Sequence, residues 1–147
     1  MNVNNEETIK HHNAQELEPK VTGIGGVFFR SNDPAETKKW YTEHLGFETN
    51  AYGATFEGRE LDNPEVINAL QWSVFKSDTT YFEPSTKEFM INYRVQNIEG
   101  LVAKMLKNGA TVLDEIVTYE YGKFVHLLDP DGNKIELWEP IGTLPQE

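Results

Sequence analysis

A histidine and a glutamate stand out in the sequence FVHLLDPDGNKIELWEP, which spans residues 124–140. Its central Asp-Pro-Asp-Gly-Asn segment contains turn-forming residue types, and the flanks are rich in Leu, Ile and aromatic residues, so the sequence predicts a β-hairpin. With residues 129–133 as the loop, His126 pairs with Glu136 across the two strands. Paired side chains in a sheet have Cβ atoms about 4.5–5.5 Å apart, which allows an imidazole and a carboxylate to share a hydrogen bond.

Two roles for this pair are open from the residues alone. In the first, His126 and Glu136 are catalytic: the carboxylate orients the ring and favours its charged form, and the two groups transfer protons as an acid–base pair. In the second, they form a buried polar pair without chemistry.

Strand alternation places further side chains on the same face as the pair. The other face of the hairpin is wholly apolar: Val125, Leu127, Ile135 and Leu137. The matching faces of two more predicted strands, VTGIGGVFFR and FMINYRV, carry aromatic, Asn and Arg side chains, and a tryptophan joins them from the predicted strand ALQWSVF. The candidate substrate-binding residues are Phe28, Arg30, Trp72, Met90, Asn92, Arg94, Phe124 and Trp138.

Apolar walls with a few polar groups are typical of a small-molecule site. A plain apolar core is the alternative interpretation of the aromatic residues. Arg94 is expected to hold a carboxylate, carbonyl or phosphate with its planar guanidinium, or alternatively to pair with Glu136 inside the protein.

The elements that must position these residues occur twice along the chain. Asp33 is a typical N-cap before a predicted helix that ends at Gly46, and Asn97 and Gly109 delimit a second helix in the same way. Strands surround each helix, so we predict an α+β fold made of two βαβββ modules, at about residues 21–83 and 86–140. Each helix must cover one face of a sheet, which leaves the opposite face for a core or a ligand.

Composition narrows the class of protein. The chain of 147 residues has no cysteine and a formal net charge of −11, which disfavours thiolate chemistry and binding to nucleic acid or anionic membranes. No apolar run is long enough to span a bilayer, and the N-terminus lacks a secretory signal pattern, so we expect a cytoplasmic protein. Residues 1–20 and 141–147 are expected to be tails of a single domain at 21–140.

The paired modules, the segment GVFFRSNDPAETKKWYTEHLGF and the closing DPDGNKIELWE resemble the vicinal oxygen chelate superfamily, which includes glyoxalase I, extradiol dioxygenases and bleomycin-binding proteins. The resemblance implies a curved eight-stranded mixed sheet around a cup, with the helices outside. In that superfamily the cup usually holds a divalent metal.

The metal ligands implied by the resemblance are largely missing from this sequence. Gly26 and Met90 stand where the superfamily has histidines, and the segment at 71–73 offers neither carboxylate nor histidine. Glu136 alone matches, and one carboxylate cannot hold a transition metal tightly. We therefore expect no metal cofactor, with Glu136 as the ligand if there is one.

The leading functional hypothesis is a glyoxalase-like protein that binds a small organic molecule in the cup. If it is an enzyme, the resemblance implies a lyase or isomerase related to lactoylglutathione lyase, with His126 and Glu136 as its acid–base pair. The alternatives are a non-catalytic protein that sequesters an antibiotic-type molecule, and a metal-dependent lyase or dioxygenase with a displaced ligand set. The expected partner is a small molecule, and a homodimer is a further option.

Overall fold

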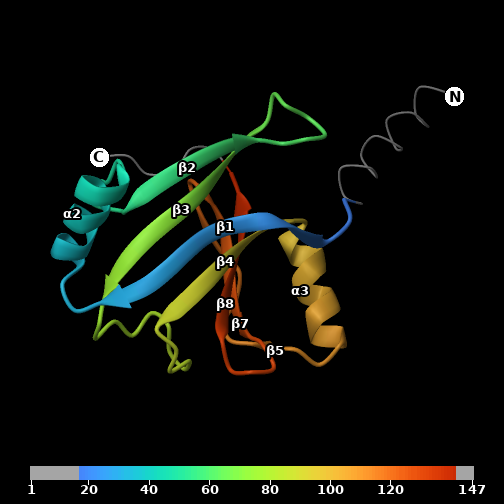
Figure 1. Cartoon of the computed structure of the whole chain (residues 1–147). Helices are drawn as coiled ribbons and strands as arrows, with labels where there is room; N and C mark the ends of the chain where they lie inside the picture. Colours follow the sequence, from blue (N-terminus) through green and yellow to red (C-terminus); the bar gives the residue numbers. More distant parts are fainter. Residues whose placement is uncertain (1–16, 142–147) are drawn as a thin grey trace, which may run out of the picture.

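The computed structural model describes residues 17–141, which form one mixed sheet and two helices (Figure 1). The strands are β1 (Lys20–Ser31), β2 (Ala54–Arg59), β3 (Ile67–Lys76), β4 (Phe89–Gln96), β5 (Thr111–Val112), β6 (Val117–Tyr119), β7 (Gly122–Leu128) and β8 (Lys134–Pro140). The helices are α2 (Pro34–Leu45) and α3 (Ile98–Lys107).

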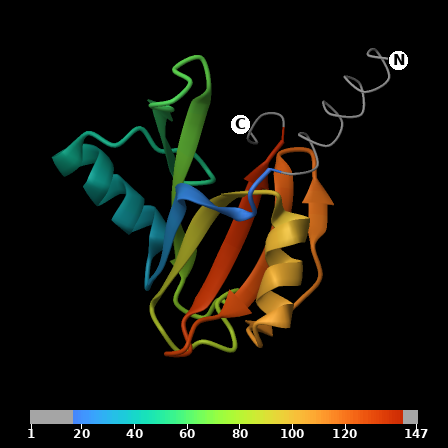
Figure 2. The same cartoon turned by 90° about the vertical axis from the view of Figure 1, so that its right-hand side faces the viewer.

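The sheet has eight strands, in the order β2-β3-β1-β4-β8-β7-β5, with β6 paired to β7. The two halves of the chain meet at its centre, where β1 runs antiparallel to β4. Each of these strands has a parallel neighbour from its own half, β3 beside β1 and β8 beside β4. The predicted α+β fold with a curved eight-stranded mixed sheet is confirmed, and the two helices flank the sheet far apart from one another (Figures 1 and 2).

Among residues 17–141 the two predicted βαβββ modules are not equal, because the first has three strands besides its helix and the second has five. The segment at 47–52 forms only an isolated bridge, between Asn50 and Gly53. The segment ATVLDEI contributes only the two residues of β5, after which the chain leaves the sheet and returns as β6. Alternation in such short segments is too brief to fix a register from sequence.

Both predicted helix starts and the end of α2 are confirmed, whereas α3 ends at Lys107 with Asn108 as its C-cap, one residue before the predicted Gly109. Asp33 accepts a hydrogen bond from the Glu36 amide at 3.2 Å, and Gly46 ends α2 with φ at +72°. Asn97 caps α3 by accepting from the Gly100 amide at 3.1 Å. The residue types at these positions therefore set the boundaries of both helices.

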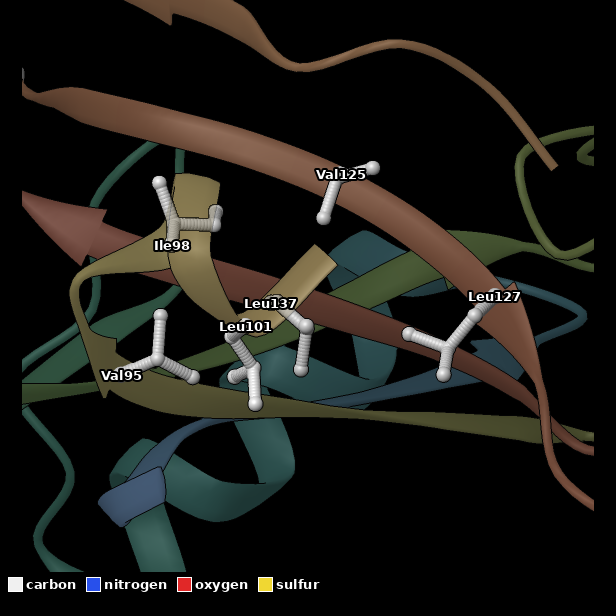
Figure 3. Close-up of a cluster of buried hydrophobic side chains, with 6 residues drawn as sticks. All are labelled: Val95, Ile98, Leu101, Val125, Leu127 and Leu137. Atoms are coloured by element: carbon white, nitrogen blue, oxygen red, sulfur yellow. The ribbon is translucent and has the colours of Figure 1, made fainter. Parts of the chain in front are cut away.

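The main core lies between α3 and the apolar face of the β7–β8 hairpin (Figure 3). Its buried members are Val95, Ile98, Leu101, Val125, Leu127 and Leu137. Helix α2 differs, because it buries none of its residues fully and leaves Trp40 51% exposed. Helix α3 therefore holds the hairpin in place, and the hairpin in turn positions the side chains on the opposite face of the sheet.

The last residues of the expected N-terminal tail are hydrogen-bonded to the domain. Residues 1–16 of the tail expected at 1–20 lie outside the described residues, as do residues 142–147 of the C-terminal one. The carbonyl of Leu17 accepts from Asn97 Nδ2 at 2.8 Å, and that of Glu18 accepts from Gln96 Nε2 at 2.7 Å. Residues 17–20 therefore pack beside the start of α3, and β1 begins at Lys20.

Candidate functional site

A cavity of about 630 Å³ opens on the face of the sheet that is opposite to α3. Strand alternation explains its position, because the residues between the apolar core positions of β7 and β8 point to this side. Six of the predicted site residues line the cavity: Phe28, Asn92, Phe124, His126, Glu136 and Trp138. The volume is in the range of small-molecule pockets, which are about 300–1,000 Å³.

Glu136 is the centre of a polar cluster at the floor of this cavity. The predicted pairing of His126 with Glu136 across the hairpin is confirmed, and His126 Nε2 lies 2.7 Å from Glu136 Oε2. Asn92 Nδ2 donates to Glu136 Oε1 at 2.6 Å, and the Tyr81 hydroxyl donates to Oε2. With three donors around it, the carboxylate is satisfied although the residue is only 3% exposed.

Asp114 holds the other side of the imidazole. Asp114 Oδ1 accepts a hydrogen bond from the His126 backbone amide at 2.7 Å. Asp114 Oδ2 lies 2.7 Å from His126 Nδ1. Burial alone would lower the pKa of His126, but the hydrogen bonds and charges of Glu136 and Asp114 outweigh it, and the pKa is raised above its ordinary value. The protonated ring donates from both nitrogens, which matches a carboxylate on each side.

Tyr81 and Asp114 were not among the predicted site residues. Tyr81 comes from the loop between β3 and β4, and burial together with the Glu136 carboxylate raises the pKa of its hydroxyl. Asp114 follows the short strand β5, where the amide of Leu113 donates to the His126 carbonyl at 2.8 Å. No periodicity in either segment could have pointed to these side chains.

Four predicted binding residues do not line the cavity, and for Trp72 the reason is the register of β3. Gln71 and Ser73 pair with Gly26 and Phe28 and share their face, so Trp72 points to the other side. There its ring centroid lies 4.7 Å from that of Tyr41, a residue of α2. The expectation that Trp72 faces the cup was therefore wrong, because its two neighbours in β3 face the cup instead.

The other three are used inside the protein. Met90 is fully buried and packs with Phe28 and Phe82 in a small second core. Arg30 donates to the Ser77 carbonyl at 3.0 Å, and its guanidinium lies 5.2 Å from the centre of the Phe82 ring.

Arg94 lies two residues beyond Asn92 on β4 and does not line the cavity. Its guanidinium donates to the backbone carbonyls of Ile24 and Ala69 at 3.4 and 3.5 Å, so neither an ion pair with Glu136 nor a place in the cavity wall is found. Burial lowers the pKa of this side chain, and the charge of Glu60 opposes that effect.

The residues present do not fit the metal site that the fold implies. Gly26 has no side chain, and a Cβ built there would lie 2.8 Å from the Phe28 ring, so an aromatic ring occupies the space of the missing ligand. Both oxygens of Glu136 already accept hydrogen bonds. Among residues 17–141, no three His, Cys, Asp or Glu side chains are arranged to hold a metal ion.

A family model matches residues 23–137, and its description is the Glyoxalase/Bleomycin resistance protein/Dioxygenase superfamily. The chain belongs to this superfamily. The predicted resemblance is thereby confirmed over most of the chain. No curated protein matches the sequence.

Solved structures with the same fold are distant in sequence. A methylmalonyl-CoA epimerase from Streptomyces coelicolor has a TM-score of 0.61 at 17% identity, over 82% of this chain and 98% of that one. A superfamily member from Vibrio splendidus 12B01 has a TM-score of 0.54 at 15% identity, over 82% and 98% of the two chains. The Mn(II)-bound glyoxalase from Novosphingobium aromaticivorans has a TM-score of 0.53 at 19% identity, over 88% of this chain and 43% of that one. At these identities the likeness concerns the fold.

None of the helices in residues 17–141 is long and apolar enough to cross a membrane.

Proposed function

We propose that the protein binds a small organic molecule in the cavity, with the cluster of Tyr81, His126 and Glu136 as its polar floor. The observation that carries this proposal is a satisfied polar cluster at the base of a cavity whose walls are largely aromatic. Placed polar groups among apolar walls orient a ligand and give specificity, which is the common design of small-molecule sites.

The hydrogen bonds of the cluster favour binding over catalysis. A general base must present a free lone pair to its substrate. Here His126 faces a carboxylate at each ring nitrogen, and Glu136 accepts from three donors. The cluster is thus built to hold its shape, as in a protein that sequesters a small molecule.

Proton transfer by His126 and Glu136 is the second candidate function, and the position of Tyr81 favours it. Tyr81 belongs to the loop between β3 and β4 and is 39% exposed, so a ligand hydroxyl or carbonyl could take its place. Displacement of the phenol would free Glu136 Oε2 for a proton on the ligand. A metal-dependent lyase or dioxygenase is not supported, because Gly26, Met90 and the occupied Glu136 do not make a metal site.

The three tryptophans provide a test of binding. In ¹⁵N-labelled protein titrated with a library of small metabolites of mixed charge, a ligand in the cavity should shift the indole N–H signal of Trp138, which lines it. The signals of Trp40 and Trp72, which lie away from the cavity, are internal controls. If no compound moves Trp138 selectively, the proposal fails.

A matched variant and an exchange experiment complete the test. Val117 lines the cavity from the exposed strand β6, so Val117→Trp should obstruct it and abolish the shifts. Any ligand found is then incubated in D₂O with the protein. Deuterium uptake at a ligand C–H that is lost in Glu136→Gln would establish the second candidate, and its absence would favour pure binding.

A further inference from the structure

We infer that the ligand is an organic cation, a protonated amine on an aromatic or apolar body. This inference rests on the proposed function and names the ligand class for the same cavity. Three features of the cavity favour such a ligand: the charges of the lining, the positions of the nearby basic residues and the aromatic rings of the wall.

The charge of the cavity lining is negative. Asp114 and Glu136 both line it, and none of the lining residues among 17–141 is a lysine or arginine. His126 lies between the two carboxylates, so the cluster has a formal charge of about −1 with the ring protonated and about −2 with it neutral. An anion entering this space would meet repulsion in either state, and a cation would be attracted.

Basic side chains near the cavity are directed elsewhere. Arg94 donates to the backbone carbonyls of Ile24 and Ala69. Lys134 Nζ donates to the Tyr81 carbonyl at 2.6 Å and lies 5.1 Å from the centre of the Tyr81 ring. A carboxylate or phosphate ligand would therefore lack a lysine or arginine partner at the cavity wall, and the anion-binding role expected for Arg94 is not available there.

Aromatic rings in the wall suit a cation as well as an apolar body. Tyr119 and Tyr121 stack with ring centroids 5.6 Å apart, and Phe124 lies edge-on to both, at 5.8 and 5.7 Å. Phe124 also stacks on Trp138 at 6.2 Å. The faces of such rings attract ammonium groups, with the strongest effect where water is excluded.

An acceptor is also left for an ammonium N–H. Asn92 Nδ2 is committed to Glu136, which fixes the orientation of the amide. Among the described residues Asn92 Oδ1 is buried without a hydrogen-bond partner, and it fills the space beside Gly25, where a built Cβ would lie 2.3 Å from it. Both residues line the cavity, and the side chain of Asn92 is almost fully buried. An unpaired buried acceptor favours a ligand that donates.

Three probes with one aromatic body and different charge test the inference: naphthylethylamine, naphthylethanol and naphthylacetate. Each is titrated into ¹⁵N-labelled protein at neutral pH, and the Trp138 indole signal gives the affinity. The amine should bind about tenfold more tightly than the alcohol, and the acetate should bind most weakly. Added salt should weaken binding of the amine and leave the alcohol unchanged.

Substitutions then locate the charge. Asp114→Asn should reduce the affinity for the amine several-fold with little effect on the alcohol, and Asp62→Asn, at an exposed loop position away from the cavity, is the matched control. If the alcohol or the acetate binds as tightly as the amine in the wild-type protein, the inference is wrong while the proposed function stands. If no probe and no library compound shifts Trp138, both are wrong.

Discussion

Glu136 joins three parts of the chain through one carboxylate. Asn92 reaches it from β4, His126 from β7 and Tyr81 from the loop between β3 and β4. Glu136 itself is buried, so the loss of any one of these donors leaves a buried acceptor partly unsatisfied. The cluster therefore contributes to stability as well as to the chemistry of the cavity.

Tyr81→Phe tests the stability contribution of this cluster. The change removes one hydrogen bond to a charged acceptor and no packing volume, so it should lower the free energy of unfolding by about 1.5–3 kcal/mol in urea titrations. Tyr119→Phe, which removes an exposed hydroxyl from the same cavity wall, should change it by less than about 0.5 kcal/mol. Equal effects of the two changes would show that the Tyr81 hydroxyl is not held by Glu136.

The raised pKa of His126 gives stability a defined dependence on pH. The folded protein binds the imidazole proton more tightly than the unfolded chain, whose histidine pKa is about 6.5, so the stabilisation is full below that pH. It is lost as the pH rises through the higher pKa of the folded state. The difference in free energy of unfolding between wild type and His126→Gln should therefore shrink as the pH rises above about 6.5. A difference that grows with pH would mean that the ring is neutral in the folded protein.

At the scale of the elements, the turn directly before β2 lies close against β3. Gly53 has φ at +117°, and a Cβ there would lie 1.9 Å from the Trp72 carbonyl oxygen. Gly58, within β2, has no atom within 4 Å of a built Cβ. The two glycines lie five residues apart, yet only the first is required by the backbone.

The two glycines predict opposite outcomes for the same substitution. Backbone strain of this kind alone costs about 1–3 kcal/mol. Gly53→Ala should lower the free energy of unfolding by more than that, because the steric clash adds to the strain. Gly58→Ala should be neutral or stabilising by up to about 1 kcal/mol. Thermal unfolding of both variants measures this, and a tolerated alanine at position 53 would contradict the geometry of the turn.

The sequence predicted the register of the hairpin correctly, but it did not predict the positions of several site residues. The register of the hairpin was predicted from alternation around a strong turn, and it places His126 opposite Glu136 as expected. Asp114 and Tyr81 could not be placed, because they come from a two-residue strand and a loop, where no period exists. The prediction for Trp72 was wrong because no turn or cap shows which residues of β3 face the cavity. The prediction for Arg94 failed because alternation gives the face of a strand on which a residue lies, but not its distance from the site along that strand.

At the scale of the whole molecule, the superfamily fold is retained while its usual metal positions hold Gly26 and Met90. Elemental analysis of protein purified without chelators should thus give well under one transition-metal ion per chain. Added Mn²⁺, Ni²⁺ or Zn²⁺ should leave the melting temperature unchanged, since a metal bound only to the folded protein would raise it. A stoichiometric metal on Glu136 would reopen the interpretation as a metal-dependent enzyme.

The formal net charge of −11 acts in the same direction as the acidic cavity. A negative surface raises the local concentration of cations and lowers that of anions, and the effect weakens with ionic strength. The cavity and the molecule as a whole would therefore select for the same ligand charge.

A crystal structure with the tightest-binding library compound tests the central claim most directly. We predict that the compound lies in the cavity between the aromatic wall of Tyr121 and Phe124 and the cluster at Glu136, with a ligand donor toward Asn92 or the carboxylates. A compound found elsewhere, for example against the exposed face of α2 around Trp40, with the cavity vacant, would contradict it.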